Sequence, residues 1–355
     1  MEISFERLLG EIAEGITVTD PRQPDNPLVY VNPAFCRLTG YSAAEVLGRN
    51  CRFLQGPDTD QPELDRLRAA ISSGQPCIVE LLNYRKDGTR FWNNLSISPV
   101  FNSAGEIIYF TGIQLDVTRR RRLEDKQREF VGNLAHELKT PLAALMGLTD
   151  TMERQPEMQQ ETRLSILASL QSQITRLNET VESILNLSRI DYAGLSSARQ
   201  LLDFRDVIQE SIDSVSDFAG TQGVELEYRQ PDQSVSILGD PWALSMLVGN
   251  LASNAIKYST AGTTVAVELS AQSHTCRLSV ADSGPGIASD QLELVFERFY
   301  RIDKSRSRAN GGTGLGLAIV SEVARQHRGY VTVTSEIGEG SCFTVTLPLY
   351  CGDAA

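Results

Sequence analysis

No long apolar run interrupts the sequence of 355 residues, which excludes a membrane-embedded protein. A membrane-spanning helix needs about 18 consecutive apolar residues, and no stretch approaches that length. The first residues also lack the basic and then apolar layout of a secretory signal. We therefore expect a cytoplasmic protein, and at roughly 150 residues per domain we expect two or three domains.

Cysteine pairs and strongly basic segments are absent too. The six cysteines form no CxxC pair and no cluster with histidines at metal-binding spacing, so we expect reduced thiols and neither a disulfide framework nor a zinc site. The net charge is −12, and even the most basic segment, 119–196, balances 11 basic with 11 acidic side chains. No segment therefore has the composition of a nucleic-acid-binding surface.

The residues that are present fall into three patterns. Up to about Thr118, short runs of alternating polarity separated by turn signals predict a compact α+β domain over 1–118. Over 119–196, apolar residues recur at helical spacing in two stretches, with a helix break at 154–156 between them. Over 197–355 the pattern predicts an α/β domain. Its expected strands include Val265–Leu269, Cys276–Ala281, Tyr330–Ser335 and Ser341–Leu349.

The two helical stretches of 119–196 predict an antiparallel hairpin joined by a short loop. One hairpin cannot enclose its own apolar stripes, so we expect a second copy of the chain to cover them in a four-helix dimer. The stripes contain Leu123, Phe130, Val131, Leu134, Leu138, Leu142 and Leu145, and then Leu164, Leu167, Leu170, Ile174, Leu177, Val181, Ile184 and Leu187.

Three carboxamides fall on apolar faces of the strands expected in the first domain. Because side chains alternate along a strand, Asn83, Asn93 and Gln114 each lie among apolar neighbours on one face. A buried amide without partners costs on the order of a few kcal/mol, so three together favour a planar ligand with donors and acceptors along its edge. The alternative is that the amides bond to one another or face solvent.

A nine-residue segment over 48–56, GRNCRFLQG, places the thiol of Cys51 between an amide and a guanidinium. Together with TGYS before it and NYRKDG and FWNN after it, this segment closely resembles the LOV photoreceptor domains, over about residues 10–118. The resemblance implies noncovalent flavin mononucleotide in the dark and a blue-light-driven bond between the Cys51 sulfur and the flavin ring. The implied flavin contacts are the amides of Asn50, Gln55, Asn83, Asn93 and Gln114, the ring of Phe110 and, at the phosphate, Arg52 and Arg68.

The LOV resemblance also implies how light reaches the rest of the chain. Bond formation protonates a flavin ring nitrogen, so Gln114 is expected to rotate and exchange its NH2 for its C=O. Gln114 lies two residues before Asp116-Val117-Thr118, where the last strand gives way to the helices. We expect the rotation to alter the joint over 116–122 and the packing of the dimer helices. A flavin redox or oxygen sensor on the same kinase is the alternative.

His136, one of only three histidines, lies on the helical face opposite the apolar seam. It is about 200° from Leu138 around the helix axis, so geometry alone is compatible with a solvated surface histidine. Glu137 is placed to accept an imidazole proton, and Pro141 predicts a bend just after the histidine. The string HELKTPL closely resembles the H box of sensor histidine kinases. This implies that His136 is phosphorylated, that Glu137 is its base and that Thr140 helps position water in a phosphatase reaction.

Glycine-rich and amide-bearing segments indicate a phosphate site in the last domain. GGTGLGLAI, which begins at Gly311, opens an apolar helix whose first N–H groups are available to phosphate. Upstream, Asn250, Asn254 and Lys257 lie near one helical face, where they suit a metal with oxygen ligands next to a phosphate. The alternative for each amide alone is a plain helix surface. A basic cluster lies between the two segments, at Arg298, Arg301, Lys304, Arg306 and Arg308.

Five segments, NLASNAIK, DSGPGI, FERFYR, GGTGLGLAI and GEGS, resemble in order and spacing the N, G and F boxes of the histidine-kinase ATP-binding domain, over about 200–350. The resemblance implies a Bergerat-type α/β sandwich that binds ATP with magnesium. Asn254 and Asn250 would hold magnesium, Lys257 would touch phosphate, and Asp282 would bind the adenine amino group. The other implied contacts are Arg301 at the terminal phosphate and Gly284, Gly286, Gly312, Gly314, Leu315 and Gly316.

These expectations combine into a dimeric, blue-light-regulated sensor histidine kinase with a PAS/LOV sensor, a four-helix bundle and an α/β sandwich. Phosphate from ATP would pass to His136 and then to an aspartate of a response regulator. We expect that regulator to be a separate protein, because the chain has no receiver domain. Two alternatives remain. One is a photosensory scaffold that binds nucleotide without catalysis, and the other is an ATPase of the gyrase and Hsp90 group, which would not need the H box.

Overall fold

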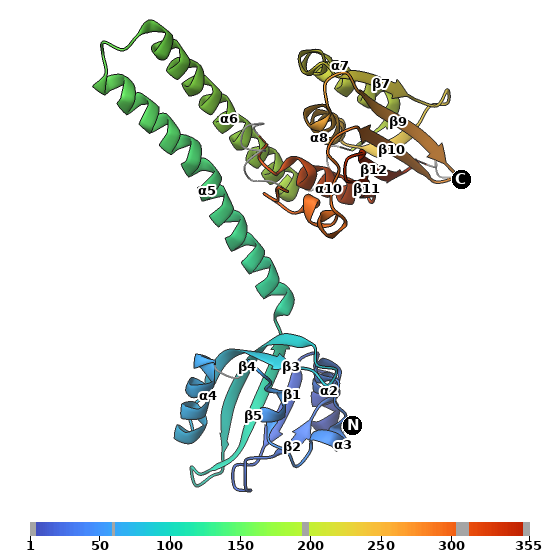
Figure 1. Ribbon diagram of the computed structural model, residues 1–355. Coiled ribbons are helices and arrows are strands. Elements are labelled where there is room, and N and C mark those ends of the chain that lie inside the picture. The colour runs from blue at the N-terminus through green and yellow to red at the C-terminus, as the bar shows by residue number, and fades with distance from the viewer. Residues whose placement is uncertain (1–4, 59–60, 194–198, 303–311, 351–355) are drawn as a thin grey trace. The chain divides into compact units, whose positions relative to one another are not determined.

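The computed structural model describes residues 5–58, 61–193, 199–302 and 312–350 (Figure 1). Contacts divide the chain into two compact units, Met1–Glu129 and Phe130–Ala355. Among the helices of these described residues, none has an apolar stretch long enough to cross a membrane.

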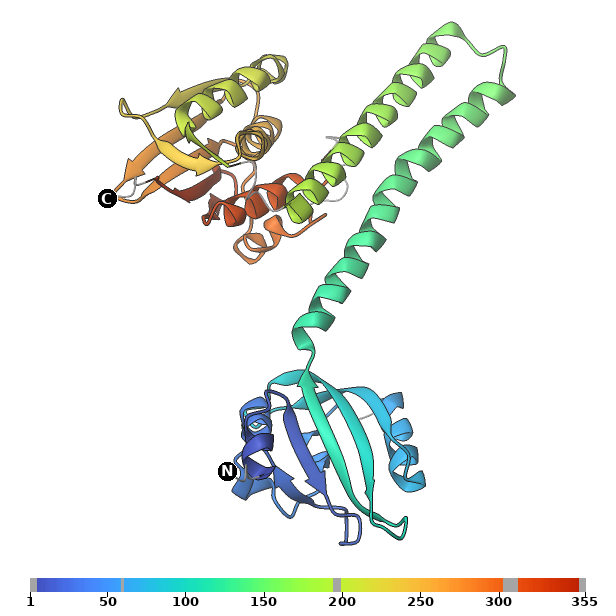
Figure 2. The same ribbon diagram turned by 180° about the vertical axis from the view of Figure 1, so that it is seen from behind.

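A five-stranded antiparallel sheet in the order β2-β1-β5-β4-β3 forms the centre of the first unit. The chain passes from β2 to β3 through short helices that pack on one face of this sheet (Figure 2). The strands are β1 (Gly15–Thr19), β2 (Leu28–Val31), β3 (Cys77–Tyr84), β4 (Arg90–Phe101) and β5 (Ile107–Asp116). The helices are α1 (Phe5–Gly10), α2 (Pro33–Thr39), α3 (Ala43–Val46), the 3-10 turn η1 (Cys51–Leu54) and α4 (Pro62–Ser73). The expected α+β domain is confirmed.

One buried asparagine shows how sequence fixes this arrangement. Asn32 is the N-cap of α2, and its Oδ1 accepts hydrogen bonds from the N–H of Phe35 (2.9 Å) and of Ile16 in β1 (2.8 Å). The same side chain therefore begins the helix and ties it to the sheet. Gly40 ends the helix with φ of 77°, a conformation that glycine adopts without strain.

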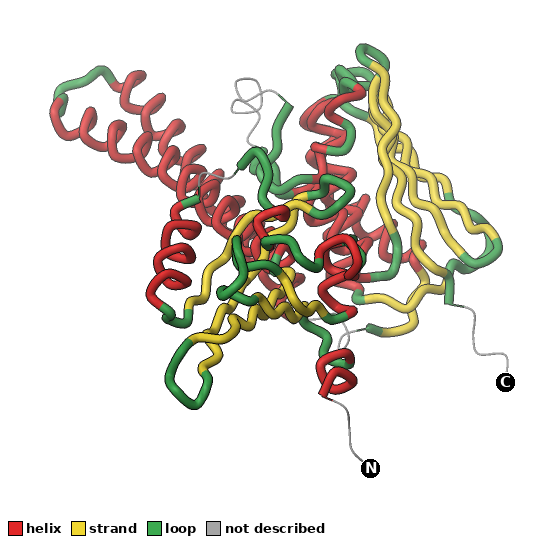
Figure 3. The backbone as a smooth tube through the Cα atoms, turned by 90° about the horizontal axis from the view of Figure 1, so that it is seen from below, coloured by secondary structure: helices red, strands yellow, loops and turns green. Residues whose placement is uncertain are grey.

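The predicted helical hairpin consists of α5 (Thr118–Arg154) and α6 (Gln160–Ala193). Figure 3 shows these as two long helices side by side. α5 continues through Pro141, whose side chain is buried, and the bend expected there stays a prediction. Much of the apolar surface of the hairpin is left uncovered. Its exposed large apolar side chains are Leu123, Val131, Leu142, Met146, Leu164, Leu167, Ile174, Val181 and Leu185.

The last part of the second unit is a two-layer α/β sandwich, as the sequence predicts. Its sheet has the order β11-β12-β10-β9-β7, with β7 parallel to β9 and the other pairs antiparallel. The strands are β7 (Glu225–Arg229), β9 (Thr264–Gln272), β10 (Thr275–Asp282), β11 (Tyr330–Glu336) and β12 (Gly340–Pro348), with a separate pair β6 (Gln200–Asp203) and β8 (Ser236–Gly239). The helices are α7 (Phe204–Gln222), α8 (Pro241–Tyr258), α10 (Gly316–Gln326) and the 3-10 turns η3 (Ser289–Gln291) and η4 (Leu294–Phe296).

The C-terminal end of α6 belongs to the core of this sandwich. Leu187 and Ile190 are 1% and 0% exposed and lie in the same apolar cluster as the buried residues of α8 and α10. Gln326 at the end of α10 donates a hydrogen bond to the carbonyl of Ile190 (2.8 Å). Arg189 stacks over the ring of Trp242, with its guanidinium carbon 4.1 Å from the ring centroid. The last turns of α6 are thus fixed to the sandwich by packing and by polar contacts.

His327 is a core residue of the sandwich rather than a reactive one. Its Nε2 accepts a hydrogen bond from the N–H of Asp240 (3.1 Å), and its Nδ1 donates to the carbonyl of Val323 (2.8 Å). These two contacts define a neutral ring protonated at Nδ1. Burial lowers the pKa of His327, which favours the same neutral form.

Candidate functional site

Cys51 begins the turn η1, beside the inner face of the first sheet. The preceding Asn50 caps this turn, because its Oδ1 accepts a hydrogen bond from the N–H of Arg52 (3.0 Å). The Cys51 Sγ lies 3.7 Å from Nε2 of Gln114 on β5. Burial raises the pKa of Cys51 to about 11, so the group is a thiol and not a thiolate at neutral pH. The structure thus brings the predicted cysteine to the predicted glutamine.

The three carboxamides singled out in the sequence form one buried cluster. Asn83, Asn93 and Gln114 are 4%, 1% and 1% exposed. Asn93 Nδ2 donates to Asn83 Oδ1 (3.0 Å) and to Gln114 Oε1 (3.1 Å). The Oδ1 of Asn93 is buried with no hydrogen-bond partner in the described part of the chain. The amides therefore bond to one another and still leave a buried acceptor, which a ligand with an N–H donor would satisfy.

The other predicted flavin contacts differ in their exposure. Phe110 lies on β5, four residues before Gln114, and is 3% exposed, whereas Gln55 ends η1 and is half-buried. The two arginines predicted to hold a phosphate are exposed and paired with carboxylates. Arg52 contacts Asp25 (2.7 Å), and Arg68 contacts Asp65 one turn earlier on α4 (3.0 Å). Asp25 is a neighbour of Arg52 that the sequence pattern did not indicate.

His136 is exposed on α5, as its helical phase predicts. Thr140 Oγ1 donates to the carbonyl of His136 (3.1 Å), so this side chain lies against the helix turn that carries the histidine. Glu137 faces the other way, toward α6, where Arg176 Nη2 lies 3.8 Å from its Oε2. Both side chains of this ion pair are largely buried, at 25% exposure for Glu137 and 17% for Arg176. No pattern in the sequence indicated Arg176.

The residues predicted for nucleotide binding converge where the C-terminal half of α8 meets the N-terminus of α10. Asn250 Nδ2 donates to the carbonyl of Met246 (2.8 Å), which leaves its Oδ1 directed at Gly316. A Cβ atom at Gly316 would lie 2.7 Å from that oxygen and 3.7 Å from Nδ2 of Asn254. A Cβ at Gly312 would lie 3.1 Å from Nζ of Lys257. Glycines therefore keep open the space that these polar groups face.

The backbone N–H groups and cationic side chains around these residues favour a bound anion. Among the residues that the structure describes, no side chain caps the N-terminus of α10, where the buried Leu315 is the N-cap residue, so its first N–H groups are available to a ligand. Burial and the nearby charge of Arg301 lower the pKa of Lys257. A bound phosphate would offset that repulsion. Lys304, Arg306, Arg308 and Gly311, which the sequence also indicated, lie outside the described residues.

Asp282 is the last residue of β10, and a Cβ atom at Gly284 would lie 2.7 Å from both its Oδ1 and the carbonyl oxygen of Tyr258 at the end of α8. Its Oδ1 accepts a hydrogen bond from the N–H of Gly284 (2.9 Å), and burial raises the pKa of this carboxyl group. Gly286 and Gly314 both have φ of 71°, and each lies where a Cβ would meet backbone atoms of another segment. Among the described residues, no group of three or more histidine, cysteine or acidic side chains is placed to bind a metal. A metal here would need amide and phosphate oxygens as ligands.

Comparisons with known proteins match all three parts of the chain. Residues 13–119 match the PAS domain, residues 126–193 the His Kinase A (phospho-acceptor) domain, and residues 239–350 the histidine kinase-, DNA gyrase B- and HSP90-like ATPase. The fold and these matches give the chain the domain composition of a sensor histidine kinase.

Individual relatives that the chain resembles are also named as histidine kinases. The chain is 36% identical over 225 residues to Sensor histidine kinase RppB of Synechocystis sp., covering 63% of this chain and 50% of the relative. It is 46% identical over 145 residues to Blue-light-activated histidine kinase 1 of Erythrobacter litoralis, covering 39% of this chain and 40% of the relative. The solved LOV domain of the Erythrobacter litoralis EL346 blue-light activated histidine kinase is 44% identical, with a TM-score of 0.30, and the match covers 30% of this chain and 99% of that one.

The chain spans about half the length of the curated relatives it matches. Within these relatives, one that is similar over 145 residues is named as a blue-light-activated kinase.

Proposed function

We propose that the chain is a blue-light-regulated histidine kinase. It transfers the terminal phosphoryl group of ATP to His136 and then to an aspartate of a response regulator, and it acts on the same regulator as a phosphatase. One observation carries the light-regulated part of this proposal. The Cys51 sulfur lies 3.7 Å from Gln114, and Gln114 is two residues from Asp116, where β5 ends before α5.

The cofactor of the sensor is flavin mononucleotide in this proposal. The edge of its ring would meet the amides of Asn83, Asn93 and Gln114, and the orphan Oδ1 of Asn93 would accept a ring N–H. When bound, the flavin absorbs blue light and supplies the ring carbon to which the Cys51 sulfur becomes bonded. Arg52 and Arg68 would bind the phosphate once they exchange their present carboxylate partners for phosphate oxygens. Asn50, Gln55 and Phe110 would complete the pocket.

ATP with magnesium is the proposed ligand of the second unit. Asn250 and Asn254 would hold the metal, and Lys257 would contact phosphate oxygens. Asp282 would accept a hydrogen bond from the adenine amino group, next to Gly284 and Gly286. The N–H groups at the start of α10 would complete the phosphate site. The other contacts proposed there are Arg301, Gly312, Gly314, Leu315 and Gly316.

The transfer itself needs a nucleophile and a proton acceptor. An imidazole nitrogen of His136 attacks the terminal phosphorus of ATP, the bond from that phosphorus to the bridging oxygen breaks, and ADP leaves. The remaining ring proton is held by Glu137, which must turn from Arg176 toward the histidine. Thr140 lies one turn from His136, where it would orient the water that hydrolyses the phosphorylated regulator.

A homodimer is the proposed assembly. The hairpin exposes apolar side chains on both helices, including Leu142, Met146 and Ile174. Two hairpins that pack these side chains together would remove them from water in a four-helix bundle. The response regulator would then bind near the exposed His136 of this bundle.

The decisive experiment measures phosphohistidine formation in the purified chain of known flavin content. The protein is incubated with γ-labelled ATP in darkness and under blue light, and acid-labile label is counted. We expect label on the protein and a yield that differs between the two conditions. Equal yields from a flavin-loaded protein would refute light regulation, and an unlabelled protein would refute the kinase activity.

Gly316→Ala tests the proposed nucleotide site. The added methyl would lie 2.7 Å from Asn250 Oδ1 and displace it, so we expect magnesium-dependent ATP binding to weaken by roughly tenfold, or about 1.4 kcal/mol. The control is Gly249→Ala on α8, where a Cβ has nothing within 4 Å. That variant is expected to keep wild-type affinity and to gain about 0.5 kcal/mol of stability. Titration with a fluorescent ATP analogue measures the affinity of each variant. Equal affinities of Gly316→Ala and Gly249→Ala would contradict this site.

A further inference from the structure

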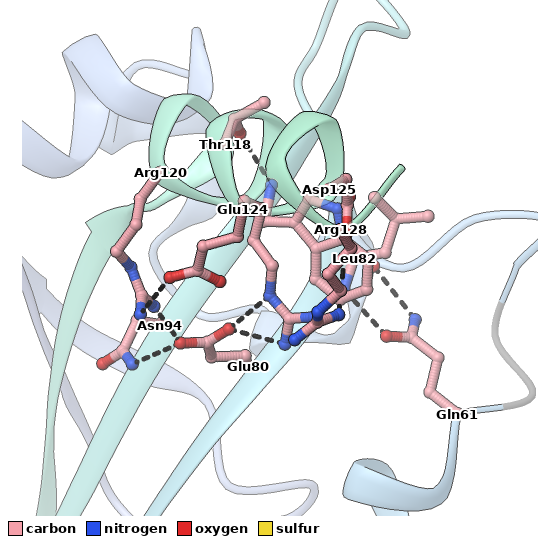
Figure 4. Close-up of polar contacts among 11 residues, drawn as sticks. Gln61, Glu80, Leu82, Asn94, Thr118, Arg120, Glu124, Asp125 and Arg128 are labelled. Atoms are coloured by element: carbon pink, nitrogen blue, oxygen red, sulfur yellow. Dashed lines mark hydrogen bonds and ion pairs between the residues drawn. The ribbon is translucent and has the colours of Figure 1, made fainter. Parts of the chain in front are cut away.

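The first turn of α5 is held on the sensor sheet by a carboxylate that the proposed chemistry does not use. Glu80 lies on β3 between Val79 and Leu81, which are buried, so its side chain is on the opposite face of the sheet. It accepts hydrogen bonds from Arg121 Nε (2.6 Å), from Arg120 Nη2 and from Asn94 Nδ2 on β4 (3.3 Å). Figure 4 shows Glu80 below the helix, with Arg120 and Asn94 beside it. We call these contacts the Glu80 clasp.

The Glu80 clasp is more enclosed than an ordinary surface ion pair. The Glu80 side chain is only 19% exposed. Burial opposes its ionisation, but hydrogen bonds from Arg121 and Arg120 outweigh burial and lower the pKa of Glu80. Charge-assisted hydrogen bonds are shorter and stronger than neutral ones, and two arginines share one carboxylate here. The clasp therefore holds the first turn of α5 on the sheet.

Trp92 on β4 forms the second half of this attachment. The Arg121 guanidinium lies over the Trp92 ring, 4.6 Å from its centroid. The backbone N–H of Trp92 donates a hydrogen bond to Thr118 Oγ1 (2.9 Å), and the backbone carbonyl of Trp92 accepts one from the N–H of Val117 (2.9 Å). The start of α5 is thus bound to β4 through backbone and side chain at one residue.

Strand β4 connects the attachment of α5 to the buried amide cluster. Trp92 and Asn94, which contact the clasp, flank Asn93, which bonds to Asn83 and Gln114 on the other face. In the sheet, Asn94 pairs with Glu80, and Asn93 pairs with Asp116 at the end of β5. A shift of Asn93 that follows rotation of Gln114 would move both flanking residues, since consecutive residues of a strand move together.

We propose that Glu80 is a positioning residue that clasps the first turn of α5, and that the amide cluster opens this clasp through β4 after illumination. The inference rests on the proposed function, because it names the exit route of the light signal. In darkness the clasp holds residues 118–122 against the sheet. After illumination the rearranged amides displace Trp92 and Asn94, and the arginines lose their shared partner.

Glu80→Gln tests the clasp because it removes the charge and keeps the size of the side chain. The matched control is Glu124→Gln, since Glu124 contacts the same Arg120 (3.4 Å) from within α5 and does not attach the helix to the sheet. Hydrogen–deuterium exchange over 118–124 of the dark protein is measured. We expect exchange about tenfold faster in Glu80→Gln, because neutral hydrogen bonds are roughly half as strong. Glu124→Gln is expected to exchange like wild type.

The second readout is the ratio of phosphohistidine yields in light and darkness. We expect Glu80→Gln to bring this ratio close to one while flavin content and blue-light bleaching stay at wild-type values, since Glu80 does not face the amide cluster. An unchanged ratio would overturn the signalling role of the clasp, and unchanged exchange would overturn the attachment of α5 by Glu80. If Glu80→Gln does not fold, Arg120→Gln with Arg121→Gln removes the same bonds from the helix side, and the same outcomes apply.

Failure of the proposed function is distinguishable from failure of this inference. A wild-type protein that binds no flavin, or that phosphorylates equally in light and darkness, refutes the light-regulated kinase and with it the signalling role of Glu80. A light-responsive wild type whose response survives Glu80→Gln refutes only the signalling role of the clasp. Faster dark exchange in Glu80→Gln but not in Glu124→Gln supports the attachment of α5 by Glu80 in either case.

Discussion

Replacing His136 by glutamine is expected to reduce phosphohistidine formation by about 100-fold or more, because an amide nitrogen is not a nucleophile toward phosphorus. Glutamine is close to histidine in length and is a good helix former, so α5 should keep its structure around an exposed position. The measurement is acid-labile label retained on the protein after incubation with γ-labelled ATP. ATP affinity, measured separately, should equal that of wild type.

The matched control for this variant is His274→Gln. His274 is also exposed, but it lies between β9 and β10, outside the proposed sites. We expect this control to retain wild-type labelling. Label that persists in His136→Gln would show that another residue accepts the phosphoryl group, and the assignment of the phosphoacceptor would be wrong.

Cys51→Ala is expected to abolish both the blue-light bleaching of the flavin and the difference in phosphohistidine yield between light and darkness. Alanine has no sulfur to bond to the ring, while its small side chain leaves the pocket and the amide cluster in place. Absorbance under blue light and label counts under both conditions measure the two effects. Because the reactive group itself is removed, the light-induced change in each measurement should vanish.

The matched control for Cys51→Ala is Cys77→Ala, which removes a different sulfur. Cys77 is half-buried at the start of β3, where it pairs with Ile97 on β4, and the structure places it apart from the amide cluster. It is expected to keep full bleaching and full light dependence. A Cys51→Ala protein that still responds to light, or to oxidation of the flavin, would favour the redox sensor over bond formation at the sulfur.

The inward-facing site residues of the sensor could be predicted because strands have a fixed period. Asn83, Asn93 and Gln114 lie on three strands, and in each the alternation with apolar residues alone assigns the buried face. The motif around Cys51 then indicated which residue meets them. For the helices, a period of 3.6 residues correctly placed His136 on the exposed face of α5.

Contacts between elements could not be predicted in the same way. Pairing of Glu80 with Arg121 depends on the register of β3 with β4 and on the direction in which α5 begins, and no local pattern encodes either. The pairing of Glu137 with Arg176 depends on the rotation of α6 about its axis relative to α5. Glu137 could therefore be predicted as a base beside the histidine, but its pairing with a cation on the neighbouring helix could not.

The end of α6 is anchored in the apolar core of the sandwich, and this limits how the sandwich can move. Extracting Leu187 and Ile190 from the core would cost roughly 3 kcal/mol or more, since each buried aliphatic side chain contributes about 1.5–3 kcal/mol. The final turns of this helix consequently travel with the domain as one rigid piece. If the sandwich moves relative to the hairpin, we therefore expect α6 to bend upstream of Leu187.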